Sequence, residues 1–134
     1  MAVDFRSLLK ESMRNQETGE RWFEDLDIGG VFYLSIQASA LHASTPPELL
    51  DDVNAYEAFQ VTLQTKQGVF ISGKKGAWDH LEQHDWFALL QQDTPIIREA
   101  ENVPVSVVQT IYEDVVACTD KHPDMIIKKG LQLM

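Results

Sequence analysis

The sequence predicts one domain of the α+β class: an N-terminal helix, a three- or four-stranded antiparallel sheet, and a C-terminal helix packed on one face of the sheet. The chain has 134 residues, of which 44% are hydrophobic, so residues 1–134 can form a single domain with its own core. Alternating apolar residues indicate strands in the first half, and helical spacing appears towards both ends. This order favours segregated layers over alternating βαβ units.

Residues 4–16 are expected to form the N-terminal helix. Asp4 can cap its first turn, and the pattern stops at Thr18–Gly19. Its apolar members fall on one stripe at helical spacing: Phe5, Leu8, Leu9 and Met13.

The sheet is predicted from two alternating segments, residues 31–38 and 56–65. Residues 66–68 form a short turn, and residues 69–72 return as the second arm of a β-hairpin. We expect one face of the sheet to be covered and the other solvated. The residues expected on the covered face are Phe32, Leu34, Ile36, Ala38, Phe59, Val61 and Leu63.

The residue pattern in the second half of the chain predicts helices. Asp85 can cap a short helix that Pro95 ends, and residues 95–102 form a short extended piece. Residues 103–120 predict the clearest helix, with Pro104 in its first turn and a continuous apolar stripe. The apolar tail, residues 125–134, predicts an edge strand, a cover for the core or a segment that docks on a neighbour.

Charge is the strongest feature of the composition. Acidic residues outnumber basic ones by 21 to 11, which gives a net charge of −10. From Glu17 to Thr65 there are nine acidic residues and one basic residue, Arg21; from Gly76 to Asp120 there are again nine, with Arg98. Such a surface argues against direct nucleic-acid binding and would attract a basic protein surface. The alternative is that acidity only keeps the protein in solution.

The sequence also bears on location. Cys118 is the one cysteine, so no internal disulfide can form, which fits a reducing compartment. The N-terminus does not resemble a signal peptide, and no segment has the 18 apolar residues that a membrane span needs. A cytoplasmic protein without membrane association is expected.

The stretch WDHLEQHDW, residues 78–86, raises the question of a metal site. On a helix, His80 and His84 share a face and could both ligate zinc. Zincin proteases use H-E-x-x-H, and Leu81 here stands in place of the catalytic Glu, so protease chemistry is not supported.

A structural zinc site would need a second pair, Cys118 and His122, which are again four residues apart. Pro123 pushes His122 out of helical geometry, and Cys118 lies beside the apolar stripe of the last helix. The alternative is two exposed histidines on an acidic turn, with Trp78 and Trp86 partly buried.

Two further patterns contain residue types used in catalysis. GVFISGKK, residues 68–75, approaches a phosphate-binding loop, but Lys75 replaces the Ser or Thr that holds magnesium and the segment has strand character. Ser39, His42 and Ser44, with Asp51–Asp52 nearby, lack the elbow and oxyanion hole of a nucleophilic triad. No catalytic residue and no cofactor is therefore predicted.

The segment GERWFEDLDIGGVFY, beginning at Gly19, resembles the opening of MaoC-type hydratases, in which a similar stretch precedes a glycine and a strand. The catalytic Asp and His motif of that family has no counterpart downstream, and the central helix of its hot-dog fold is not apparent. The resemblance therefore implies no hydratase activity. We expect Trp22, Phe23 and Leu26 to pack a short turn onto the core.

These observations predict a small acidic, non-catalytic protein that binds a basic surface of a protein partner as an inhibitor or regulator. In general character the chain resembles small uncharacterised bacterial and phage-type proteins, which implies no activity. The alternatives are a homo-oligomeric structural module such as a homodimer, and a small metal-binding protein using His80 and His84. The predicted binding residues are Trp78, Asp79, Glu82, Asp85, Asp51 and Asp52.

Overall fold

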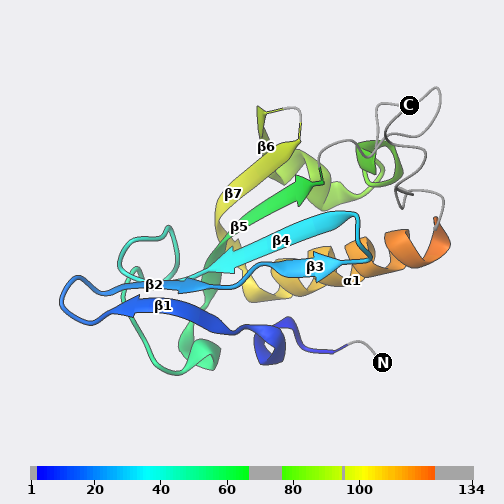
Figure 1. The fold of residues 1–134 in the computed structure, drawn as a ribbon. Coiled ribbons are helices and arrows are strands. Elements are labelled where there is room, and N and C mark those ends of the chain that lie inside the picture. The colour runs from blue at the N-terminus through cyan, green and yellow to red at the C-terminus, as the bar shows by residue number, and fades with distance from the viewer. Residues whose placement is uncertain (1–2, 67–76, 95, 123–134) are drawn as a thin grey trace.

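The computed structural model describes residues 3–66, 77–94 and 96–122. These residues form a five-stranded antiparallel sheet of order β3-β4-β5-β7-β6, a separate hairpin of β1 and β2, and one α-helix (Figure 1). The strands are β1 (Glu11–Asn15), β2 (Glu20–Phe23), β3 (Leu26–Ile28), β4 (Phe32–Gln37), β5 (Ala58–Thr65), β6 (Gln91–Thr94) and β7 (Ile97–Pro104). The helices are α1 (Val105–Lys121) and the short 3₁₀ turns η1 (Phe5–Leu8), η2 (Val53–Ala55), η3 (Ala77–His80) and η4 (Asp85–Leu89).

The predicted N-terminal helix over residues 4–16 is wrong. The chain makes only the single 3₁₀ turn η1 and then enters strand β1, which pairs with β2. Met13 therefore points to solvent with 43% of its surface exposed, whereas Phe5 is fully buried against Phe59. Thr18 and Gly19, predicted to end that helix, are part of the hairpin turn between β1 and β2, where Gly19 has a φ of +77°.

The predicted three- or four-stranded sheet is also wrong, because the described residues contain seven strands in two antiparallel sheets. Trp22 and Phe23, expected in a short turn, lie in β2, and Leu26 begins β3. The short extended piece at residues 95–102 corresponds to β7, an eight-residue strand that pairs with both β5 and β6. Backbone pairing with neighbouring strands decides these elements, and the pattern within each segment carries little of that information.

The alternating segments were predicted correctly. Strand β4 pairs with β5 in the register Leu34↔Leu63 and Ile36↔Val61. Their inward side chains are fully buried, as expected from the two-residue period of a strand. The return strand predicted at residues 69–72 lies outside the described residues, and within them β5 pairs with β4 on one side and β7 on the other.

The predicted C-terminal helix is confirmed as α1, which crosses behind the five-stranded sheet in Figure 1. It begins directly after Pro104 and ends at Lys121. Its apolar stripe enters the core through Val108, Ile111, Val115 and Cys118. The tail at residues 125–134 lies outside the described residues. Within the described ranges, no helix has both the length and the apolar character needed to cross a bilayer.

Candidate functional site: an acidic groove beside the last helix

A groove of about 460 Å³ runs between residues 24–29 and the C-terminal half of α1. We call it the acidic groove. Its floor is apolar and consists of Leu8, Leu26, Ile28 and Val116, with the ring of Tyr112 beside them. Its rim is polar and consists of Glu24, Asp25, Asp27, Asp120 and Lys10. The groove therefore combines apolar surface with an excess of carboxylates.

Most of the rim carboxylates have no internal counter-charge. The carboxylate of Asp27 forms an ion pair with Lys66, in which Oδ2 lies 2.9 Å from Nζ. The side chains of Glu24, Asp25 and Asp120 are exposed and make no ion pair or hydrogen bond with any residue that the structure describes. Lys10 is the one cation among the described residues that line the groove. The rim thus retains a net negative charge that faces solvent.

One wall of the groove is fixed by a close backbone approach. Gly29, in the turn after β3, has a φ of +63°, a region that residues with a Cβ rarely adopt. A Cβ built at this position would lie 2.4 Å from the Cβ of Thr119 and 2.6 Å from its Oγ1. Only glycine lets the turn lie directly on α1, so this contact sets the distance between the two sides of the groove.

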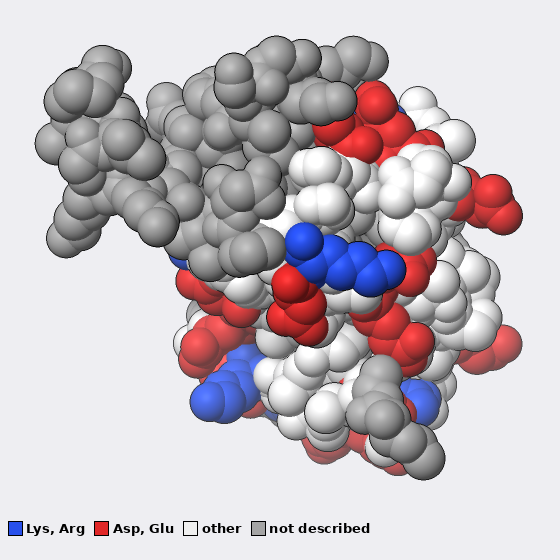
Figure 2. Space-filling view, turned by 90° about the vertical axis from the view of Figure 1, so that its right-hand side faces the viewer, with Lys and Arg blue, Asp and Glu red and all other residues white. Residues whose placement is uncertain are grey.

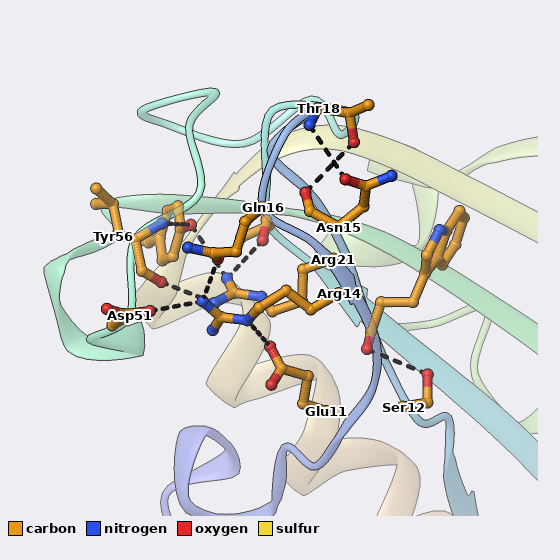
Figure 3. A network of polar contacts seen from close by, with 12 residues as sticks. Glu11, Ser12, Arg14, Asn15, Gln16, Thr18, Arg21, Asp51 and Tyr56 are labelled. Atoms are coloured by element: carbon orange, nitrogen blue, oxygen red, sulfur yellow. Dashed lines mark hydrogen bonds and ion pairs between the residues drawn. The ribbon is translucent and has the colours of Figure 1, made fainter.

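The arginine of the first acidic stretch, Arg21, is 2% exposed. Its guanidinium donates to the carbonyl oxygens of Ala38 (2.6 Å) and Leu50 (2.7 Å) and to the Tyr56 hydroxyl (3.1 Å). It also lies 4.5 Å from the centre of the Phe23 ring. Figure 3 shows Arg21 turned towards Tyr56, whereas Arg14 on the neighbouring strand faces Asp51 and Glu11. Arg21 therefore ties β2 to the loop after β4 and pairs with carbonyls instead of with surface carboxylates.

The arginine of the second acidic stretch, Arg98, is used in a similar way. Its Nε donates to the carbonyl oxygen of Leu90 at 3.0 Å, and its guanidinium lies 4.0 Å above the centre of the Phe87 ring. Arg98 is half-buried in β7. The one cation within each acidic stretch is thus engaged by backbone carbonyls and aromatic rings, and surface carboxylates are not its partners.

The predicted binding residues fall into two separate regions, which lie at opposite ends of the molecule in Figure 1. Asp51 pairs with Arg14 at 2.8 Å, and Asp52 accepts from the backbone N–H of Asn54 at the start of η2. The second region is formed by η3, η4 and the turn between them. There Trp78 is buried against Phe32, Asp79 is half-buried, and Glu82 and Asp85 are exposed. The structure does not bring the six residues into one site, and their role in binding stays a prediction.

The predicted zinc ligands are brought together, although not in one helix. His80, His84, Cys118 and His122 line a common cavity of about 120 Å³ between the η3–η4 region and the end of α1. The rings of His80 and His122 are stacked, with centroids 3.7 Å apart and planes 15° apart. Stacked imidazoles cannot both direct a nitrogen lone pair at one tetrahedral ion. Among the described residues, no group of three or more His, Cys, Asp or Glu side chains is arranged to hold a metal.

Of the other two predicted ligands around this cavity, His84 is engaged in a contact within the protein and Cys118 is buried. The Nδ1 atom of His84 lies 3.4 Å from the carboxylate of Asp114, which also accepts a hydrogen bond from the indole N–H of Trp86. Burial raises the pKa of the Cys118 thiol to about 11, so the thiolate that a metal requires is disfavoured. This geometry gives zinc no support, and the zinc interpretation remains a prediction from sequence.

Cys118 should react slowly in the native protein. It is 5% exposed, and because its pKa is raised, little thiolate forms near neutral pH. We expect iodoacetamide to modify Cys118 much more slowly in the native state than in a strong denaturant, as followed by intact mass. Equal rates in the two conditions would contradict this environment.

His42 and its serine neighbours do not form a nucleophilic triad. The Nε2 atom of His42 lies 3.1 Å from the carbonyl oxygen of Arg21, which can only accept, so the neutral ring carries its proton there. The Ser44 hydroxyl donates to the carbonyl oxygen of Pro46. Ser39, His42 and Ser44 are all buried, and each side chain serves the packing of the loop.

His42 should make stability depend on pH. Burial is the main cause that lowers the pKa of His42 below its ordinary value of 6.5. As pH falls through that value, the unfolded chain takes up a proton before the folded protein does, so stability falls with pH. We expect the urea midpoint to drop between about pH 7.5 and about pH 5.5, and to drop less in His42→Gln. An identical pH dependence in the variant would contradict a buried neutral His42.

Searches of protein-family models, of curated proteins and of solved structures find no match to this chain. The rim residues Glu24, Asp25, Asp27 and Asp120 were not among the predicted binding residues. The run E-D-L-D at residues 24–27 is a visible signal for three of them. The fourth, Asp120, lies beside them only because α1 packs against β3.

Proposed function

We propose that this protein is a small acidic, non-catalytic binding protein that engages a basic surface of a protein partner, as an inhibitor or regulator. The observation that carries the proposal is that Arg21 is buried and that the half-buried Arg98 is engaged by the Leu90 carbonyl oxygen and the Phe87 ring. The carboxylates of the two acidic stretches are therefore not paired with the cations that lie between them in the sequence. A surface of this kind attracts basic partners over long range and accelerates their association.

The arrangement of surface charge supports this proposal. Figure 2 shows one face of the molecule, on which several separate groups of Asp and Glu side chains are scattered among uncharged residues, while Lys and Arg appear at fewer places. The described cations Arg6, Arg14 and Lys66 each pair with nearby carboxylates. We place the protein in the cytoplasm, where a buried free thiol such as Cys118 is stable.

The homo-oligomeric alternative depended on the apolar tail at residues 125–134, which lies outside the described residues, and on the β-branched last helix. The apolar stripe of that helix is buried in the protein's own core. The metal-binding alternative depended on His80 and His84, whose contacts are described above. No contact among the described residues favours either alternative over the acidic binding protein.

Affinity capture tests the proposal. Immobilised protein is incubated with lysate of its native cell at low salt, eluted in salt steps from about 0.1 M to about 1 M, and the eluate is identified by mass spectrometry. We expect a basic protein that is released as salt screens the charges. A partner that remains bound at the highest salt, or partners without a basic surface, would contradict electrostatic recognition.

A further inference from the structure

We propose that the acidic groove is the docking site for one short basic, amphipathic segment of the partner protein. Apolar side chains of that segment would occupy the floor, and its lysines or arginines would reach the carboxylates of the rim. This inference rests on the proposed function and names the site and the chemistry of the partner.

The dimensions and floor of the groove fit such a segment. A volume of about 460 Å³ lies within the range of roughly 300–1,000 Å³ that is typical of clefts for small molecules, so the groove has room for a few side chains of such a segment. Leu8, Leu26, Tyr112 and Val116 line the groove and are only partly buried in the described structure. Burial of their remaining apolar surface by a partner would contribute to affinity in proportion to the area covered.

The rim supplies the specificity for positive charge. Glu24 and Asp25 lie on the β2–β3 side, and Asp120 lies on the α1 side, so carboxylates face the groove from two elements. None of the three is neutralised by an ion pair with a described residue. The Tyr112 hydroxyl has no hydrogen-bond partner among those residues either, and it can accept from an incoming cationic group.

The two sides of the groove are already held in position in the unbound protein. Gly29 and Thr119 are in direct backbone-to-side-chain contact, and β3 is paired with β4 in the five-stranded sheet. A groove that needs little rearrangement loses less conformational entropy when a segment docks.

Other occupants fit this groove less well. A second copy of the chain carries the same net charge of −10 and would be repelled. A small inorganic cation would leave the apolar floor uncovered. A basic segment with apolar side chains complements both the floor and the rim.

The test uses fluorescein-labelled 12-residue peptides and fluorescence polarisation. The probe has Lys and Leu at amphipathic helical spacing, a second peptide replaces every Leu with Ser, and a third replaces every Lys with Glu. We expect the Lys/Leu peptide to bind the full chain, the Lys/Ser peptide to bind at least about fivefold more weakly, and the Glu/Leu peptide not to bind.

Two protein variants with the same net charge locate the site. Asp25→Lys with Asp120→Lys reverses two rim charges, whereas Asp93→Lys with Glu101→Lys reverses two exposed charges on β6 and β7, at the opposite edge of the sheet. We expect the groove variant to lose at least about tenfold in affinity and the matched variant to lose about threefold or less. Thermal melting of both variants checks that they remain folded.

The outcomes separate the two proposals. Equal losses in the two variants, with binding that still weakens in salt, would overturn the groove and leave acidic binding intact. No affinity for either basic peptide at low salt, both in the full chain and in its variant with Lys128→Ser and Lys129→Ser, would overturn both. Binding that appears only when Lys128 and Lys129 are replaced with Ser would assign the groove to the chain's own tail, which also overturns a partner segment as its occupant.

Discussion

Replacement of Arg21 with alanine is expected to lower the free energy of unfolding by about 3–5 kcal/mol. The variant would leave the carbonyl oxygens of Ala38 and Leu50 and the Tyr56 hydroxyl without their guanidinium donor. Hydrogen bonds to a charged group contribute about 1.5–3 kcal/mol each, and the loss is offset in part because a buried charge is also removed. Urea unfolding followed by tryptophan fluorescence measures the change.

Arg14→Ala is the matched control, because Arg14 is the register partner of Arg21 across the hairpin. Arg14 makes its ion pairs with Glu11 and Asp51 at the surface, where such pairs contribute little. We expect its variant to unfold close to the wild-type midpoint. If the two variants were equally destabilised, Arg21 would not have the structural role that its burial indicates.

Replacement of Gly29 with alanine is expected to cost about 2–4 kcal/mol of stability. A backbone with a φ of +63° is strained by about 1–2 kcal/mol for a residue with a Cβ. The new Cβ would also lie within 2.7 Å of three atoms of Thr119, so β3 and α1 must separate. We expect a lower thermal midpoint together with weaker binding of the Lys/Leu peptide, because the groove would change its width.

The Gly30→Ala variant separates the backbone strain from the clash with Thr119. Gly30 also has a positive φ, +71°, but a Cβ there would meet no atom within 4 Å. Its variant should show the backbone strain alone and should bind the peptide as the wild type does. A Gly29 variant no less stable than the Gly30 variant would mean that the turn does not press on Thr119.

The strands with regular alternation were predictable because the information is local. In β4 and β5 every second residue is apolar, and those residues are the fully buried ones, from Phe32 to Leu63. Helix α1 was predictable for the same reason, since Val108, Ile111 and Val115 recur at helical spacing and proline precedes the helix.

The N-terminal segment was not predictable from its local pattern. Phe5, Leu8 and Met13 happen to have helical spacing, but pairing of residues 11–15 with residues 20–23 outweighs the weak helix preference of a short segment. The β7 strand was underestimated for a related reason, because its exposed positions are charged and it is stabilised by neighbours on both sides.

The candidate site could not be predicted from composition, because it depends on where particular side chains lie in the folded protein. The sequence shows nine acidic residues around Arg21, but it does not show that the guanidinium turns inward. It also does not show that Asp120 lies across the same groove as Asp25, because that proximity follows from the packing of α1 against β3. Long-range packing therefore converts a general acidity into a particular groove.

Amide chemical-shift mapping tests the central claim most directly. ¹⁵N-labelled protein is titrated with the unlabelled Lys/Leu peptide at low salt, and the shifts are mapped onto the structure. We expect the largest changes at Asp25, Leu26, Val116 and Asp120, and their disappearance as salt is raised. Changes confined to β6 and η4, or changes that persist undiminished at high salt, would contradict an acidic groove that recognises a basic segment.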